Sequence, residues 1–208
     1  MSAPGAAAFE RHLDLGCGTT PRNPYGKRSL YGVDLRRLES NAQFEFAAAN
    51  LAFEPIPFAS DMFGSVSAFD FIEHMPRVLN GSEPHTTCFP FVRLMDEVWR
   101  VLAPGGLFYA LTPCYPSREA FQDPTHVNII TEGTHLYFCG ERPIAAMYGF
   151  NGRFEVRRAQ WVIPEHSQMA TPPTWRQEWT RQRKAKRGRL AYFLWELEAH
   201  KPVTGATG

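Results

Sequence analysis

The residues best placed to do chemistry are two glycines and two acids near the N-terminus. An apolar stretch at 11–15 runs directly into the turn Gly16-Cys17-Gly18, and Asp14 stands two residues ahead of the first glycine. Because glycine carries no side chain, the backbone of such a turn can approach a ligand closely. Asp34 ends the next apolar stretch, where a carboxylate can accept hydrogen bonds from both hydroxyls of a ribose. Alternatively, residues 16–18 form a plain tight turn that binds no ligand, and Asp34 caps the segment that follows it.

A second group of reactive side chains lies in two segments that each follow a predicted strand. The group consists of Asp70, Glu73 and His74, after 65–69, and of Asp123, Thr125 and His126, after 106–111. His126, Asp123 and His74 are the candidate catalytic residues, since a base is needed wherever an acceptor must lose a proton. Asp123 and Thr125 could instead satisfy backbone donors in a turn, and His74 could bond a loop carbonyl. A divalent metal is a further alternative, but the spacing is not diagnostic, so we predict no metal site.

Seven strands and one clear helix must position these residues. The strands are predicted at 11–15, 29–35, 43–48, 65–69, 106–111, 153–162 and 190–199. The helix is predicted at 91–102, where apolar residues fall on one face, and Pro104-Gly105-Gly106 terminates it. A shorter helix is predicted at about 143–148. This alternation predicts an α/β fold with a mostly parallel seven-stranded sheet, whose last strand is antiparallel.

The first two crossovers between strands are unusually short. Residues 19–28 contain Pro21, Pro24 and Gly26, which disfavour a full helix there, and only a few residues separate Asp34 from the third strand. We therefore expect shortened helices after the first two strands and a thinly covered face of the sheet. A dinucleotide site requires GxGxxG opening a helix whose N-terminus meets the pyrophosphate. Because Pro21 occupies the position of the third glycine, the sequence disfavours a dinucleotide.

Taken in order, these segments resemble the class I S-adenosylmethionine-dependent methyltransferases, a Rossmann-like family. The resemblance runs from His12 to about Leu111. It is carried by HLDLGCG at 12–18, YGVDL at 31–35, Asn50-Leu51 followed by Ile56-Pro57-Phe58, SVSAFDFIEH at 65–74 and MDEVWRVLAPGG at 95–106. The sequence departs from the family at Thr20, where a third glycine is usual. Arg22 or Asn23 is the candidate to hold the carboxylate end of the cofactor instead.

The resemblance implies S-adenosylmethionine as the cofactor and assigns its site residue by residue. The backbone of Gly16, Cys17 and Gly18 would line the methionine and ribose, and Asp14 would accept a hydrogen bond from the methionine ammonium. Asp34 would hold the ribose, with Leu35 beside it in the same site. Asn50 would meet the adenine amino group, Leu51 would lie against the ring, and Phe69 would lie near the methionine moiety.

The acceptor side is expected to come from insertions late in the chain. We predict a single domain over 1–208, with a flexible tail at 1–10 and acceptor-side insertions at 113–138 and 165–188. Aromatic residues there either line a pocket or belong to the core: Tyr115, Phe121, Tyr137, Phe138, Trp161, Trp175 and Trp179. Residues 175–189 predict a basic amphipathic helix that packs its tryptophans and solvates its charges. A phosphate-bearing or acidic acceptor, or RNA, is the alternative for that helix.

Composition narrows the function further. A formal charge of +1 over 208 residues gives no overall case for nucleic acid, and no apolar run approaches the length of a membrane span. Four cysteines without zinc-ligand spacing are typical of a reduced, cytoplasmic chain. We predict a cytoplasmic S-adenosylmethionine-dependent methyltransferase acting on an oxygen or nitrogen atom of a small molecule, such as a sugar or another metabolite. An RNA methyltransferase using the helix at 176–189, a non-catalytic cofactor-binding scaffold and a homodimer stay open.

Overall fold

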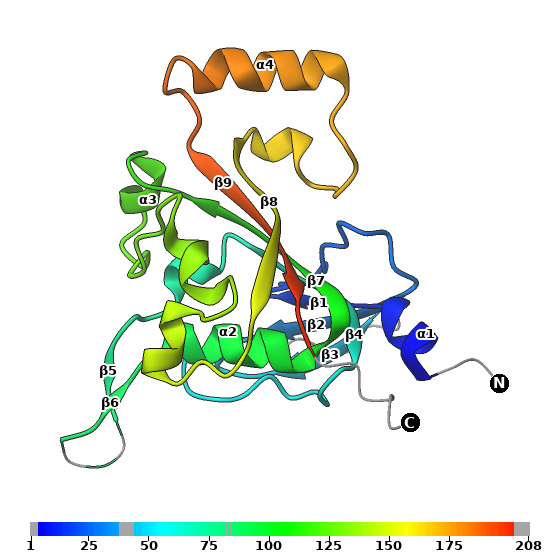
Figure 1. Ribbon diagram of the computed structural model, residues 1–208, viewed down its shortest axis with the longest axis vertical. Helices are drawn as coiled ribbons and strands as arrows, with labels where there is room; N and C mark the ends of the chain where they lie inside the picture. The colour runs from blue at the N-terminus through cyan, green and yellow to red at the C-terminus, as the bar shows by residue number, and fades with distance from the viewer. Residues whose placement is uncertain (1–3, 38–43, 82, 84, 202–208) are drawn as a thin grey trace.

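The structure, a computed structural model, describes residues 4–37, 44–81, 83 and 85–201 (Figure 1). Its centre is a seven-stranded sheet in the order β3-β2-β1-β4-β7-β9-β8. These strands are β1 (Arg11–Leu15), β2 (Ser29–Asp34), β3 (Glu45–Ala48), β4 (Phe63–Phe69), β7 (Leu102–Pro113), β8 (Phe154–Val162) and β9 (Tyr192–Ala199). Strands β3, β2, β1, β4 and β7 run parallel, and β9 is antiparallel to both β7 and β8. The predicted fold, mostly parallel with an antiparallel last strand, is confirmed.

The strand order places a switch point between β1 and β4. The chain builds outward from β1 through β2 to β3 and then returns to add β4 on the other side of β1. Leu13 accordingly pairs with Tyr31 of β2 and with Val66 of β4. In open α/β sheets, ligands bind outside the carboxyl ends of the strands at such a point. The glycine turn after β1 and the residues after β4 therefore share the favoured position for a ligand.

One face of the sheet packs against helix α2 (Pro90–Val101) over a large apolar core. The helix forms where the sequence has helical apolar spacing, and it buries Phe91, Leu94, Met95, Val98 and Val101. The strands present alternate apolar residues to this face, among them Leu13, Leu15, Val66, Ala68, Phe108, Ala110, Phe193, Trp195 and Leu197. The core therefore extends continuously from β1 to β9.

The end of α2 differs from the prediction. Helix α2 ends at Val101 because Leu102 is already extended, with φ −70° and ψ 138°. Strand β7 starts there, so Pro104-Gly105-Gly106 lies inside the strand and does not terminate the helix. Between these residues and β4 the register shifts, at Phe63/Ser65. The prediction of a turn between helix and strand was wrong, because the glycines form an irregularity within β7.

The opposite face of the sheet is covered by loops. Residues 16–28 form turns and coil, which confirms that the first crossover lacks a full helix; part of the second crossover, 38–43, lies outside the described residues. A small cluster here consists of Phe69, Tyr109, Leu111, Val162 and Leu194, with Tyr25, Ala170 and Tyr192 packed against it. Ala170 donates its N–H to the Pro24 carbonyl, so two segments far apart in sequence cover this face together.

Two further segments bear on predictions. Of the tail predicted to be flexible, residues 1–3 lie outside the described residues, and the next six form a short helix, α1 (Pro4–Phe9), whose end contacts β4 closely: a Cβ on Gly64 would lie 2.5 Å from the Phe9 Cα. Helix α4 (Trp175–Ala185) projects from the sheet beyond β8 (Figure 1). Its tryptophans do not pack as predicted, since Trp175 is 74% exposed and Trp179 59% exposed. Arg181 anchors the helix instead, by donating to the Trp161 carbonyl.

The remaining elements are short. They are the β5–β6 hairpin (Leu79–Asn80 and Thr87–Cys88), α3 (Glu119–Gln122) and the 3₁₀ turns η1 (Ile72–His74), η2 (Thr134–Phe138), η3 (Ile144–Tyr148) and η4 (Pro164–His166). The short helix predicted at about 143–148 is thus a 3₁₀ turn, η3. In the part of the chain that the structure describes, no helix is long and apolar enough to cross a membrane.

Candidate functional site

The glycine turn after β1 requires both of its glycines. Gly16 has φ +67° and Gly18 has φ +54°, a backbone region that residues with a side chain rarely adopt. The N–H groups of Gly16 and Cys17 both donate to the Val33 carbonyl, at 2.8 and 3.1 Å, which fixes the turn against β2. The Phe71 ring lies over the turn, because a Cβ on Gly16 would meet its Cδ2 at 2.6 Å. Glycine is therefore needed here both for φ and for close packing.

Asp34 stands at the end of β2 as predicted and binds the same turn. Its carboxylate accepts from the Gly18 N–H at 3.0 Å and from the Arg36 N–H at 3.0 Å, and it pairs with the Arg36 guanidinium at 3.3 Å. Burial alone would raise the pKa of Asp34, but the hydrogen bonds from Arg36 and Gly18 lower it below its usual value. The group is thus an ionised acceptor, and Leu35 beside it is 67% exposed.

Asp14 is fully buried and accepts hydrogen bonds that fix the segment after the glycine turn. One oxygen accepts from the Ser67 hydroxyl at 2.5 Å, and the other accepts from the Arg22 N–H at 2.8 Å. Burial raises the pKa of Asp14 to about 6. The carboxylate therefore holds residues 19–28 in place where a helix is missing. Its contact with the methionine ammonium stays a prediction.

The Asp14 carboxylate ends a chain of buried hydrogen bonds. The Ser67 hydroxyl has one proton and gives it to Asp14, so it accepts from the His12 Nε2–H at 2.9 Å. The His12 Nδ1 therefore accepts from the Ser65 hydroxyl at 2.7 Å. Burial lowers the pKa of His12 to about 3, in agreement with a neutral imidazole.

Most of the other residues assigned to the cofactor site are buried. Cys17, Leu51 and Phe69 are all buried, and Cys17 fits against β2, where a Cβ on Gly32 would lie 2.5 Å from its Sγ. Phe69 has the Arg22 guanidinium 5.0 Å from its ring centroid. The Asn50 Oδ1 accepts from the Ala52 N–H and caps the turn after β3. These residues shape the surroundings of the turn, and their contacts with a cofactor stay predictions.

The acceptor-side residues come together as predicted. The Asp123 carboxylate accepts from the Thr125 N–H at 2.8 Å and from the Thr125 hydroxyl at 2.6 Å, and these hydrogen bonds lower the pKa of Asp123. The same hydroxyl lies 2.9 Å from the His74 Nδ1, and the His74 and His126 rings meet edge to face with centroids 4.8 Å apart. Because the Thr125 proton goes to Asp123, Thr125 accepts from the His74 Nδ1–H. The His74 Nε2 therefore carries a free lone pair.

Glu73 lies directly beneath this group. It is 1% exposed, and its Oε2 accepts from the Thr112 hydroxyl at 3.0 Å. Burial raises the pKa of Glu73 to about 8. Its Oε1 is buried without a hydrogen-bond partner among the described residues. A carboxyl group with an unsatisfied oxygen is thus placed next to two histidines.

Asn128 joins the two segments that carry these residues. Its N–H donates to the Glu73 carbonyl at 2.9 Å, and its side-chain amide donates to the Ile72 carbonyl at 2.9 Å. Arg77 in turn donates to the Asn128 Oδ1 at 2.6 Å. The loop after β7 is thereby fixed to η1, the turn that also places Phe71 on Gly16. Cofactor-side and acceptor-side residues thus belong to one connected framework.

Comparison with known proteins identifies the fold. No family model and no curated protein matches the chain. Among solved structures, the chain superposes on a methyltransferase from the Haloferax volcanii complex with the Trm112 methyltransferase activator, with a TM-score of 0.54, 15% identity and coverage of 92% of this chain and 83% of that one. It also superposes on an S-adenosylmethionine-dependent methyltransferase from Mesorhizobium loti. The TM-score is 0.52 and the identity 17%, with coverage of 94% of this chain and 93% of that one. The chain has the class I methyltransferase fold.

The same fold also carries other reactions. The [4+2]-cyclase SpnF matches with a TM-score of 0.51 and 14% identity, over 94% of this chain and 76% of that one. Fold alone therefore does not fix the chemistry of a protein with the class I methyltransferase fold. The reaction has to be argued from the residues at the switch point.

Several residues of this site were not among the predicted ones. Thr112 and Asn128 were missed, as were His12, Ser65 and Ser67. The signal for the last three is visible in the sequence, because polar residues alternate with apolar ones in strands that the methyltransferase fold buries on both faces. No comparable signal marks Thr112 or Asn128, whose partners lie 39 and 56 residues away.

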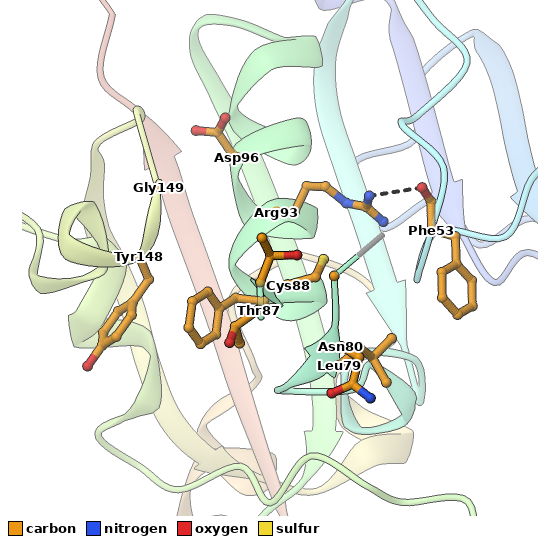
Figure 2. Close-up of a pocket in the computed structure, with 12 residues that line it drawn as sticks. Phe53, Leu79, Asn80, Thr87, Cys88, Arg93, Asp96, Tyr148 and Gly149 are labelled. Atoms are coloured by element: carbon orange, nitrogen blue, oxygen red, sulfur yellow. Dashed lines mark hydrogen bonds between the residues drawn. The ribbon is translucent and has the colours of Figure 1, made fainter. Parts of the chain in front are cut away.

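Among the large cavities that the described residues form, two border η3. One, of about 570 Å³, is formed by the β5–β6 hairpin, α2 and η3, and Figure 2 shows Arg93 reaching across it to the Phe53 carbonyl. The other, of about 620 Å³, is lined by Arg77, Tyr137 and Phe138 among others. Tyr137 thus lines a cavity, as one of the two predicted alternatives had it. Because Arg77 also bonds Asn128, this cavity adjoins the acceptor-side framework.

Proposed function

We propose that the protein is an S-adenosylmethionine-dependent methyltransferase that acts on an oxygen or nitrogen atom of a small molecule. The observation that carries the proposal is a single connection: Phe71 rests on the glycine turn and is the N-cap of η1, and His74 is the last residue of that 3₁₀ turn. A cofactor held at Gly16–Gly18 and Asp34 would thus lie close to the Asp123–Thr125–His74 chain. This arrangement suits transfer between two adjacent ligands.

The turn after β1 fits this cofactor better than a dinucleotide. A pyrophosphate is normally bound at a helix N-terminus, and residues 16–28 form no helix. S-adenosylmethionine has no phosphate and needs no helix dipole. Gly16, Gly18 and Asp34 would hold its ribose and methionine, with Asp14 keeping the turn in shape. When bound, the cofactor supplies a methyl group activated by a sulfonium.

The acceptor-side residues would prepare the acceptor for attack. The His74 Nε2 has a free lone pair and can take the proton of a hydroxyl or amine. Asp123 acts through Thr125 to orient the ring and to stabilise the charge that His74 gains, so Asp123 is a positioning residue. A correctly placed base contributes about 10²–10⁴-fold in rate. His126 packs edge to face on His74 and would contact the acceptor from the other side.

One observation favours a second candidate, an RNA or other polyanionic acceptor. Trp175 and Trp179 of α4 are exposed, and Arg176 and Arg183 lie over their rings at 5.2 and 5.5 Å. Exposed aromatic and basic side chains can stack on bases and pair with phosphates. A salt titration of tRNA binding tests this. If affinity is absent at low salt or insensitive to salt, the RNA candidate is rejected.

Calorimetry with S-adenosylhomocysteine tests whether the protein binds the cofactor, which both candidate functions require. We expect binding by the wild-type protein and a loss of at least about tenfold in affinity for Asp34→Ala, because the ribose loses its charged acceptor. Glu165→Ala, which removes an exposed acid far along the chain, is the matched control and should bind like the wild type. No binding at millimolar cofactor by the wild-type protein would reject the enzyme proposal.

The acceptor side is tested separately by turnover. A panel of sugars, amines and other hydroxylated metabolites is screened with a cofactor carrying a tritiated methyl group. On any acceptor found, His74→Ala should lower turnover about 10²-fold or more while the affinity for S-adenosylhomocysteine stays unchanged. Equal turnover in the variant and the wild type would remove His74 from the proposed chemistry. A cytoplasmic location and a homodimer remain predictions from the sequence.

A further inference from the structure

We propose that Glu73, His74 and His126 bind one divalent transition-metal ion. The inference rests on the proposed function in one respect: the ion would lie where the methyl acceptor is expected and would bind the acceptor's oxygen. In the metal-bound protein His74 would be a ligand, and the ion would activate the acceptor in place of the base described above. It replaces the sequence prediction of no metal site, which had only spacing to judge from. Metal binding itself can be measured without an acceptor or a cofactor.

Geometry provides the first argument. One ligand atom from each of the three residues lies within 4.8 Å of the other two. Around a tetrahedral zinc ion, ligand atoms are roughly 3.3 Å apart, as follows from bonds of about 2.0 Å. Both imidazoles are only half-buried, so their rings can turn to close the difference, while Glu73 is held by Thr112. The three groups come from two segments, which Asn128 fixes together.

Unsatisfied atoms provide the second argument. Among the described residues, the Glu73 Oε1 and the His126 Nδ1 are buried without a hydrogen-bond partner. Leaving such a buried group unpaired is unfavourable, because it has lost its hydrogen bonds to water without gaining others. The His74 Nε2 has a free lone pair because its Nδ1–H is donated to Thr125. A cation bound by the three side chains would provide a partner for groups that have none in the protein alone.

The surroundings have the features of an outer shell around a metal site. Metal-binding histidines usually donate their second ring nitrogen to an oriented acceptor, which sets the tautomer and raises the basicity of the ligand. Here Thr125, itself fixed by Asp123, is that acceptor for His74. The Thr112 hydroxyl orients Glu73 in the opposite sense, by donating to its second oxygen. Two of the three ligands, His74 and Glu73, therefore already have an ordered outer shell.

The ligand types indicate which ions fit. Two imidazoles and one carboxylate suit zinc, iron, cobalt or nickel, whereas magnesium and calcium prefer all-oxygen sites. Three protein ligands leave at least one open position, as in catalytic sites. An acceptor hydroxyl bound there would lose its proton to solvent more readily. Its oxygen would then form the new bond to the methyl carbon, while the sulfur keeps the electron pair of the broken bond.

The experiment measures metal binding directly. The protein is freed of metal with a chelator, dialysed and titrated with Co²⁺, whose visible absorbance reports coordination, and Zn²⁺ affinity follows from competition. We expect one ion per chain and a loss of affinity of at least roughly 100-fold in Glu73→Gln and His126→Ala. His166→Ala, an exposed histidine on η4, is the control and should bind like the wild type. Glu73→Gln keeps the shape of the buried side chain, and His126 is only half-buried, so at least one variant remains folded.

The outcomes separate this inference from the proposed function. Co²⁺ affinity that is equal in the wild type and in both ligand variants, or undetectable in all, overturns the metal site. S-adenosylhomocysteine binding is measured on the same metal-free protein. If it binds while Co²⁺ does not, the metal site fails and the methyltransferase proposal stands. If Co²⁺ binds with the expected loss in the variants but S-adenosylhomocysteine does not, the metal site stands and the methyltransferase proposal fails.

Discussion

The two faces of the sheet are built from the same strands but by different means. Beneath α2, strand residues such as Leu13, Val66 and Phe108 form one apolar core with the helix. On the opposite face, the neighbouring positions hold His12, Ser65 and Tyr109, among other residues, and loops replace helices. The first face is closed by apolar burial, which does not depend on direction. The second has a smaller apolar cluster and is closed in addition by hydrogen bonds, which do depend on direction.

The difference explains how a shortened crossover can still hold a cofactor turn. The Tyr25 hydroxyl donates to Glu196 at 2.8 Å, and the Tyr109 hydroxyl donates to the Ser167 carbonyl at 2.9 Å. Together with the chain from His12 to Asp14, these bonds attach the loops directly to the strands. A helix would have covered the face with apolar side chains. Here each loop is instead fixed at particular atoms, so its position is specified although the apolar cluster on this face is the smaller one.

The largest expected effect lies on the apolar face. Phe108→Ala removes a fully buried ring from the core under α2 and should lower the free energy of unfolding by about 3–5 kcal/mol. Urea denaturation followed by circular dichroism measures it. Phe121→Ala, at a ring that is 51% exposed, should change the value by less than about 0.5 kcal/mol. A loss below 1 kcal/mol for Phe108→Ala would contradict the assignment of stability to this face.

A substitution on the polar face should change cofactor affinity as well as the free energy of unfolding. Ser67→Ala leaves the His12 Nε2–H and an Asp14 oxygen without partners and should cost about 1–3 kcal/mol of unfolding free energy. It should also weaken S-adenosylhomocysteine binding severalfold, because Asp14 holds the turn. Ser65→Ala is the matched control: it bonds His12 alone, so it should lower stability but not affinity. If both variants bind the cofactor equally well, the link from Asp14 to the turn is absent.

The pH dependence of the unfolding free energy tests the polar face by itself, because His12 lies on that face. The pKa of His12 is lowered by burial from 6.5 to about 3, so the unfolded chain takes up this proton first as the pH falls. Its contribution to stability is complete above pH 6.5 and is lost by about 1.4 kcal/mol for each pH unit below it, down to about pH 3. The difference in unfolding free energy between wild type and His12→Asn should narrow accordingly. Asp14, whose raised pKa acts in the opposite direction, is present in both proteins. Parallel pH profiles would contradict the prediction.

The smallest change in unfolding free energy is expected for a residue that lies outside both faces of the sheet. Trp179 lies on α4, which projects beyond β8, and its ring is 59% exposed. Trp179→Ala should therefore change the unfolding free energy by less than about 0.5 kcal/mol, as measured by urea denaturation. A loss of 2 kcal/mol or more, in the range of buried side chains, would mean that α4 belongs to the core after all.

The apolar face was the more predictable part of the fold. The spacing in 91–102 predicted α2, and runs such as 65–69 predicted strands, because apolar periodicity is a local property of the sequence. Pro21 and Pro24 correctly predicted the missing helix. The tail at 1–10 and the tryptophans of α4 were judged from local composition, but their positions depend on tertiary contacts. A residue such as Gly64, against which Phe9 packs, gives no local sign of its partner.

The candidate site was predictable in part for the same reason. Gly16, Gly18 and Asp34 stand at strand ends, where sequence order and sheet topology fix the position, and they lie together as expected. The assignments of His74 and His126 to one place depended on two loops meeting, which strand topology favours. The roles of Thr125 and Asn128 could not be predicted, since a hydrogen bond between residues about 50 positions apart has no sequence signature.

The outer strand β8 bears on how copies of the chain could assemble. It is the last strand of the sheet, and its exposed residues include Glu155 and Arg157, which pair with Arg153 and Glu198 respectively. Its register also shifts between Val156 and Arg158, which bends the strand. Charges and a bulge on a border strand oppose the addition of a strand from another molecule. If the protein forms a homodimer, continuation of the sheet across two subunits at β8 is the least favourable way to build it.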